Sequence, residues 1–167
     1  MAKGIVKAFA AKMPVVMKSR TQASLDKAMA SISKGYNKLV EKGKITKESM
    51  DAMLANITTT TDYATFADAD LVIEAAVEDM QLKKDVFTEL DKICKPETIF
   101  ATNSSSLSIT EIAACTSRPT QFIGMHFFNP ADRMALVEVI KGQLTSDEVT
   151  KCIVELATSI GKQPVEV

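Results

Sequence analysis

Tryptophan is absent from the 167-residue chain, histidine occurs once and cysteine three times. The cysteines are scattered and lack the spacing of metal ligands, so we expect reduced, partly buried thiols and no metal site. A net charge of −1 with no cluster of basic residues gives no electrostatic reason to bind nucleic acid. No apolar run approaches the roughly 18 to 20 residues of a membrane span, and a signal-peptide core is missing. We therefore expect a cytoplasmic protein that binds neither a membrane nor nucleic acid.

What is present is typical of an ordinary soluble domain, with 46% hydrophobic and 25% charged residues. Short apolar runs alternate with amphipathic stretches of helical period, which predicts an α/β fold with a doubly wound, mainly parallel sheet. The run 70–76 is the best candidate for a central strand. The expected strands are residues 14–17, 57–61, 70–76, 98–101, 123–128, 135–140 and 164–167. The expected helices are residues 4–12, 21–42, 81–93, 109–114 and 147–160, with one more capped by Thr46.

The single histidine, His126, lies near the end of the strand expected at residues 123–128 and before a turn at Asn129-Pro130. An unperturbed imidazole titrates near neutral pH, so this side chain is suited to passing protons. A base at the end of a strand can face a cleft. The alternative is a core histidine that a backbone carbonyl satisfies.

Two further polar elements accompany it. Glu138 interrupts the apolar strand expected at residues 135–140, and a buried carboxylate needs a partner. If the two strands are adjacent, Glu138 can orient one imidazole nitrogen and leave the other as a base; otherwise it faces water. Residues 102–106 (TNSSS) follow the apolar run 98–101, where open α/β sheets bind ligands. The alternative for that loop is a cap on the next helix.

These three motifs, residues 102–107 (TNSSSL), 124–130 (GMHFFNP) and 136–140 (LVEVI), resemble the signature of the 3-hydroxyacyl-CoA dehydrogenase family, and in particular its bacterial 3-hydroxybutyryl-CoA members. The resemblance runs over nearly the whole chain. It implies a Rossmann-type cofactor domain and an oxidoreductase that interconverts 3-hydroxyacyl-CoA, such as 3-hydroxybutyryl-CoA, and 3-ketoacyl-CoA in fatty-acid and butyrate metabolism. The implied cofactor is NAD or NADP, the implied partner is an acyl-CoA substrate, and the complete enzyme is expected to be a homo-oligomer.

The resemblance also implies roles for individual residues. His126 would be the catalytic base and Glu138 its partner, while Ser105 and Asn129 would contact substrate and nicotinamide. Glu78 and Lys83 match positions near the nicotinamide half of the cofactor, and Lys42 matches a position that meets the coenzyme A phosphates. Without the family, the three charged residues would read as a common helix-start pair and a solvated helix end.

The chain departs from the family pattern in three places. The family's first strand and its Gly-x-Gly-x-x-Gly turn would lie upstream of Met1, with Ala2 at the third glycine. We therefore expect residues 1–167 to form a single, incomplete dinucleotide-binding domain, truncated at the N-terminus and lacking the helical C-terminal dimerisation domain. Ser19-Arg20 stands where the family has an acid that holds the ribose, which favours NADP unless this segment is a solvated turn. Residues 132–133 replace an apolar, proline-containing piece, which would reshape the entrance of the acyl pocket.

Two other functional classes stay open from the sequence. A chain without the first strand and glycine turn could be a non-catalytic Rossmann-like unit that binds acyl-CoA weakly or serves only in assembly, since an unpaired sheet edge invites pairing with another chain. It could also be a helper domain that a separate chain completes.

Overall fold

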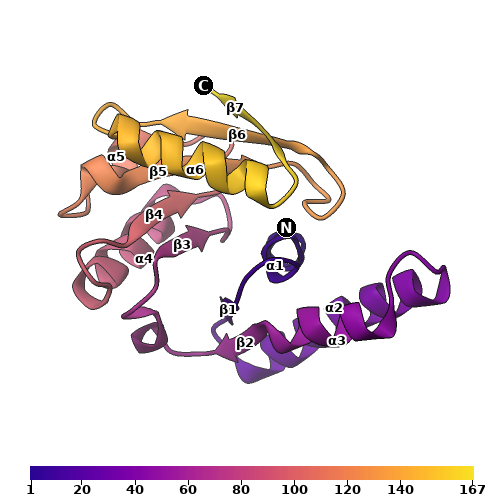
Figure 1. Ribbon diagram of the computed structural model, residues 1–167. Coiled ribbons are helices and arrows are strands. Elements are labelled where there is room, and N and C mark those ends of the chain that lie inside the picture. Colours follow the sequence, from indigo (N-terminus) through magenta and orange to yellow (C-terminus); the bar gives the residue numbers. More distant parts are fainter. The chain divides into compact units, whose positions relative to one another are not determined.

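The computed structural model describes all residues, 1–167, and the chain forms two compact units (Figure 1). One unit is Ala2–Tyr63, and the other is Ala64–Val167 together with Met1. No helix in either unit is both long enough and apolar enough to cross a membrane.

The unit Ala2–Tyr63 is a helical layer against a small parallel sheet. Strands β1 and β2 pair in parallel, Val15 opposite Ile57. Its elements are α1 (Ala2–Ala10), β1 (Val15–Lys18), α2 (Gln22–Glu41), α3 (Lys47–Ala55) and β2 (Ile57–Thr60). The core consists of Val6, Ala10, Met17, Leu25, Ile32, Tyr36, Met50 and Ile57.

The helix ends in this unit follow the local sequence. Thr21 and Thr46 are the N-caps of α2 and α3, and each threonine side chain accepts a hydrogen bond from the amide three residues later. Gly43, with φ of 70°, ends α2 in the left-handed conformation that favours glycine. The cap predicted from sequence at Thr46 is confirmed.

The unit Ala64–Val167 is built on a five-stranded sheet of order β3-β4-β5-β6-β7. All neighbours pair in parallel except β5 and β6, which are antiparallel. The predicted α/β fold with a mainly parallel sheet is thus confirmed. The strands are β3 (Leu71–Glu74), β4 (Ile99–Thr102), β5 (Phe122–Phe127), β6 (Leu136–Lys141) and β7 (Gln163–Glu166).

The position of β3 corrects one expectation. The run 70–76 was expected in the centre of a sheet, but β3 pairs only with β4 and lies at the edge of the five-stranded sheet. An apolar run predicts that both faces of a strand are covered, and it carries no information about how many edges are paired. The sequence pattern therefore could not distinguish these two positions.

Helices cover this sheet and fill its core. The last helix, α6, packs along β5, β6 and β7 (Figure 1). The ring of Phe87, on α4, is fully buried and contacts the rings of Phe100 on β4 and Phe122 on β5, at centroid distances of 5.4 and 4.7 Å. The helices are α4 (Met80–Ile93), α5 (Ile109–Ala113) and α6 (Asp147–Ser159), with short 3-10 turns η1 (Tyr63–Phe66) and η2 (Pro119–Gln121).

The apolar spacing in the helix expected at residues 81–93 predicts that Leu82, Val86, Phe87 and Leu90 point inward. Leu82 contradicts this pattern, because it is 37% exposed, whereas the neighbouring Lys83 is 1% exposed. Lys83, Phe87 and Leu90 share one helix face because they are spaced by four and three residues. The lysine can occupy this buried face because its ammonium forms an ion pair with Glu74 of β3, as described below.

Candidate active site

The site begins with the register of β5 and β6, in which His126 lies directly opposite Glu138. Successive side chains of a strand point to opposite faces of the sheet. The residues next to His126 and Glu138 in sequence, Met125, Val137 and Val139, are fully buried on one face, so the histidine and the glutamate share the other, less covered face. The two strand sequences thus place the two polar side chains together by burying the apolar ones on the opposite side.

The side chains of this pair are in contact, as expected from the sequence. The distance from His126 Nδ1 to Glu138 Oε2 is 3.0 Å, and the side chains are 16% and 35% exposed. With its proton on Nδ1, the ring donates to the carboxylate, and Nε2 keeps a lone pair that can accept a proton. The ring of Phe128 lies 4.6 Å from the imidazole, centroid to centroid.

Residues 103–107, which we call the serine loop, follow the carboxyl end of β4. Asn103 Oδ1 accepts a hydrogen bond from the amide of Phe127 at 2.7 Å, so the loop is tied to β5 beside His126. Ser105, the predicted substrate contact, is exposed. Sequence reasoning did not single out Asn103, although its place directly after a strand and within the first motif was a usable signal.

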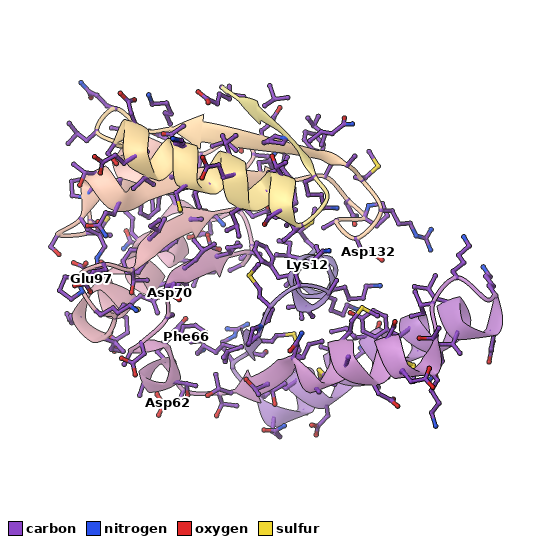
Figure 2. The ribbon with its side chains drawn as sticks, in the orientation of Figure 1. Lys12, Asp62, Phe66, Asp70, Glu97 and Asp132 are labelled. Carbon is purple, nitrogen blue, oxygen red and sulfur yellow. The ribbon has the colours of Figure 1, made fainter.

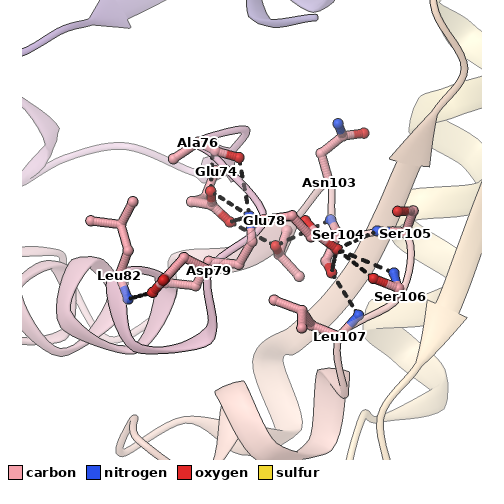
Figure 3. Close-up of polar contacts among 12 residues, drawn as sticks. Glu74, Ala76, Glu78, Asp79, Leu82, Asn103, Ser104, Ser105, Ser106 and Leu107 are labelled. Atoms are coloured by element: carbon pink, nitrogen blue, oxygen red, sulfur yellow. Dashed lines mark hydrogen bonds and ion pairs between the residues drawn. The ribbon is translucent and has the colours of Figure 1, made fainter.

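Glu78, in the connection between β3 and α4, holds the serine loop from the other side (Figure 3). Its Oε1 accepts from the Ser104 hydroxyl at 2.5 Å and from the amides of Ser105 and Ser106 at 3.1 and 3.2 Å. Burial raises the pKa of Glu78, but these hydrogen bonds and the charge of Lys83 outweigh it and lower the pKa to about 2. The carboxylate therefore stays ionised at neutral pH.

Lys83 joins Glu78 to a second carboxylate, that of Glu74. Its ammonium donates to both carboxylate oxygens of Glu74 at 2.9 Å and lies 3.6 Å from Glu78 Oε2. Thr102 also donates to Glu74, at 2.7 Å. Sequence reasoning missed Glu74, although a carboxylate inside an apolar strand was the same signal that identified Glu138. Thr102 is the first residue of the motif 102–106 that the sequence did identify.

Asn129, the second residue after β5, is exposed and is joined to Pro130 by a cis peptide bond. The loop after it reaches back to the sheet, because Lys162 Nζ donates to the carbonyl oxygens of Ala131 and Met134 at 2.5 and 2.8 Å. Asp132, labelled in Figure 2, lies in this loop between β5 and β6. Lys162 is thus a further residue that the sequence did not reveal.

The remaining predicted site residues lie in the unit Ala2–Tyr63. Ser19 directly follows β1 and its amide donates to Thr60 O at 3.3 Å, while Arg20 is exposed. Lys42 is the exposed C-cap of α2. His126 and Glu138 therefore lie opposite each other on β5 and β6, with Asn129 in the loop after β5. Ser19, Arg20 and Lys42 belong to the other unit.

Comparisons with known proteins agree with this architecture. The family model described as "3-hydroxyacyl-CoA dehydrogenase, NAD binding domain" matches residues 1–167. A 3-hydroxybutyryl-CoA dehydrogenase of Clostridioides difficile is 54% identical over 168 residues, which are 100% of this chain and 60% of that protein. The alpha subunit of a fatty acid oxidation complex from Psychrobacter cryohalolentis is 44% identical over 155 residues, 93% of this chain and 22% of that subunit.

Solved structures show the same likeness. The crystal structure of 3-hydroxybutyryl-CoA dehydrogenase from Escherichia coli K12 superposes with a TM-score of 0.98 at 41% identity, over 99% of this chain and 35% of that chain. The chain spans 60% and 54% of the lengths of two curated relatives that it matches. The resemblance inferred from the three motifs is confirmed, and the chain belongs to the 3-hydroxyacyl-CoA dehydrogenase family, whose NAD-binding domain it represents.

Proposed function

We propose that this chain carries the cofactor-binding and catalytic part of an oxidoreductase that interconverts 3-hydroxyacyl-CoA, in particular 3-hydroxybutyryl-CoA, and 3-ketoacyl-CoA. The observation that carries the proposal is the contact of 3.0 Å between His126 and Glu138, placed by opposed strands in a chain of this family. The C. difficile relative bears the name of this activity.

In the proposed reaction His126 is the general base. With Nδ1–H donated to Glu138, Nε2 takes the proton of the substrate 3-hydroxyl group, and Glu138 stabilises the imidazolium that results. The hydroxyl of Ser105 and the amide of Asn129 would donate hydrogen bonds to the oxygen on which charge develops. In the reverse direction His126 returns the proton to the same oxygen.

The residues present fit a nicotinamide dinucleotide. The ends of the parallel strands β3 and β4 carry Glu78 and the serine loop, at the edge where such sheets bind ligands. When bound, the nicotinamide supplies the hydride acceptor for oxidation and the hydride donor for reduction.

The family model describes binding of NAD, and the choice of NADP is a further proposal that rests on Ser19 and Arg20. An exposed arginine directly after β1 suits a 2′-phosphate better than a bare ribose. Lys42 is proposed to meet the phosphates of coenzyme A. The homo-oligomeric state and the cytoplasmic location stay predictions from sequence.

A fluorescence titration of the 167-residue chain with NADH and with NADPH, followed by addition of acetoacetyl-CoA, tests the proposal. Binding with consumption of the reduced nucleotide supports it, and the tighter nucleotide decides between the two cofactors. A folded chain that binds neither nucleotide would favour the other functional class, a non-catalytic unit. One observation favours that alternative: β3 pairs with a strand on one side only, and such an open edge can pair with another chain in an assembly.

A further inference from the structure

We infer that Glu74 is a positioning residue: its buried carboxylate holds Glu78 and the serine loop in place. Neither the family match nor the sequence motifs give this residue a role. The inference rests on the proposed function only for its consequence, the placement of Ser105 against substrate. Its structural content stands on contacts within the unit Ala64–Val167.

Glu74 ends strand β3, and every acceptor contact of its carboxylate leads toward the site (Figure 3). Oε1 accepts from Lys83 at 2.9 Å and from Thr102 Oγ1 at 2.7 Å. Oε2 accepts from Lys83 at 2.9 Å and from the amide of Ala76 at 2.6 Å. A single carboxylate thus joins the end of β3, the end of β4, the start of α4 and the turn that leads to Glu78.

Two routes connect this carboxylate to the serine loop. Along the first, Lys83 Nζ lies 3.6 Å from Glu78 Oε2, and the other oxygen of Glu78 accepts the amides of Ser105 and Ser106. Along the second, Thr102 Oγ1 accepts from the amide of Ser104 at 3.4 Å, and the Ser104 hydroxyl accepts from Leu107 N at 3.1 Å. The contacts close a ring through Glu74, Lys83, Glu78, Ser104 and Thr102.

The burial of this ring argues against a role in stability alone. Glu74 and Lys83 are 6% and 1% exposed, and Thr102 is fully buried. Apolar side chains of similar volume usually stabilise a core as well as a buried ion pair does, because removing two charges from water is costly. A charged pair at the ligand-binding edge of the sheet is therefore better explained by the loop that it fixes.

The same burial bears on the role of Lys83. Its ammonium contacts Glu74, Glu78 and the carbonyl of Ala76, and only 1% of the residue is exposed. We therefore include Lys83 in the positioning network, where its charge acts on Glu78.

The test is amide hydrogen exchange of the full chain with Glu74→Gln, which keeps the shape and removes the charge. Loss of charge-assisted contacts should raise exchange of the amides of Ser105, Ser106 and Leu107 about tenfold or more, relative to amides of β5 in the same sample. The matched control is Asp70→Asn, which removes an exposed ion pair with Lys95 beside the other end of β3 and should leave the loop unchanged.

Thr102→Val removes the hydrogen bond to Glu74 and the one from the amide of Ser104, with little change of shape, and it covers the case in which Glu74→Gln does not fold. It should raise exchange in the same amides about threefold or more. The inference is overturned if the serine-loop amides keep their wild-type exchange rates, or if exchange rises equally in β5, which would show general destabilisation only.

Activity provides the second readout, and it separates the two proposals. In a chain that turns over acetoacetyl-CoA, Glu74→Gln should lower kcat about tenfold or more with a smaller change in the KM for nucleotide, because an oriented contact is lost. If the wild-type chain shows no turnover, the proposed function fails, while the exchange rates still decide whether Glu74 positions the loop.

Discussion

At the scale of single residues, the tautomer of His126 is the feature that the chemistry depends on. Glu138 Oε2, 3.0 Å from Nδ1, stabilises the form with the proton on Nδ1. Without that acceptor the neutral ring can carry its proton on Nε2. Nε2 then has no free lone pair and cannot take the proton of the substrate. The Glu138 carboxylate therefore affects the reaction indirectly: by holding the proton on Nδ1, it keeps Nε2 free to act as the base.

Replacement of the carboxylate tests this directly. Glu138→Gln should change the population of the two tautomers and lower kcat roughly 10²- to 10⁴-fold, since an oriented base is lost. The ¹⁵N spectrum of the chain, which contains a single imidazole, records which ring nitrogen carries the proton. Glu155→Gln, on the exposed surface of α6, is the control. Unchanged ¹⁵N shifts and rate in Glu138→Gln would remove Glu138 from the mechanism.

Glu78 gives a second prediction at this scale, on acid stability. Its pKa is lowered from 4.5 to about 2 in the folded chain, so its contacts stabilise the fold fully above the unfolded value and are lost as the pH falls toward 2. The free energy of unfolding, measured with urea between about pH 5 and 2, should fall more steeply for wild type than for Glu78→Gln. Parallel curves would show that Glu78 does not hold the serine loop.

At the scale of elements, the packing of α5 on β5 and β6 requires a glycine. A Cβ at Gly124 would lie 2.9 Å from Cβ of Ile140 and 3.0 Å from Cδ1 of Ile109, closer than side chains approach. Gly124→Ala should therefore destabilise the chain by about 1–3 kcal/mol through overpacking. Thermal unfolding measures this loss of stability. The control is Ala114→Gly at the C-cap of α5, outside the sheet, which should change the stability only by the small amount usual for a helix end. A stable Gly124→Ala variant would contradict the described approach of α5.

The connection between β5 and β6 is the other element with a testable anchor. Lys162 is buried and donates to the carbonyls of Ala131 and Met134. Lys162→Met keeps much of the apolar stem but leaves both carbonyls without this donor, so it should cost about 1–3 kcal/mol. Lys151→Met, exposed on α6, should stay within about 0.5 kcal/mol. Urea unfolding compares the two, and equal values would show that Lys162 does not anchor the loop.

At the scale of the whole molecule, the sequence predicted what local patterns control. Hydrophobic period and the cap at Thr46 predicted helices and strands, and the strand patterns around His126 and Glu138 predicted that these two side chains could meet. The edge position of β3 could not be predicted, because pairing partners are set by segments distant in sequence.

The buried polar ring was missed for a related reason. A carboxylate in an apolar strand such as Glu74 signals that a partner is needed, but only the fold shows that this partner is Lys83, from the first turns of α4, and that the two meet out of water. The exposed Leu82 is the other consequence, since the inward position that a leucine was expected to fill belongs to the lysine.

The most direct test of the molecule as an oxidoreductase compares wild type and His126→Gln in the consumption of NADH with acetoacetyl-CoA. General base catalysis is worth roughly 10²- to 10⁴-fold, so the variant should lose about 3 to 5 kcal/mol of barrier lowering while it remains folded. Turnover by wild type that falls by this factor is the predicted result. A His126→Gln chain that keeps most of the wild-type rate would contradict the assignment of His126 as the base.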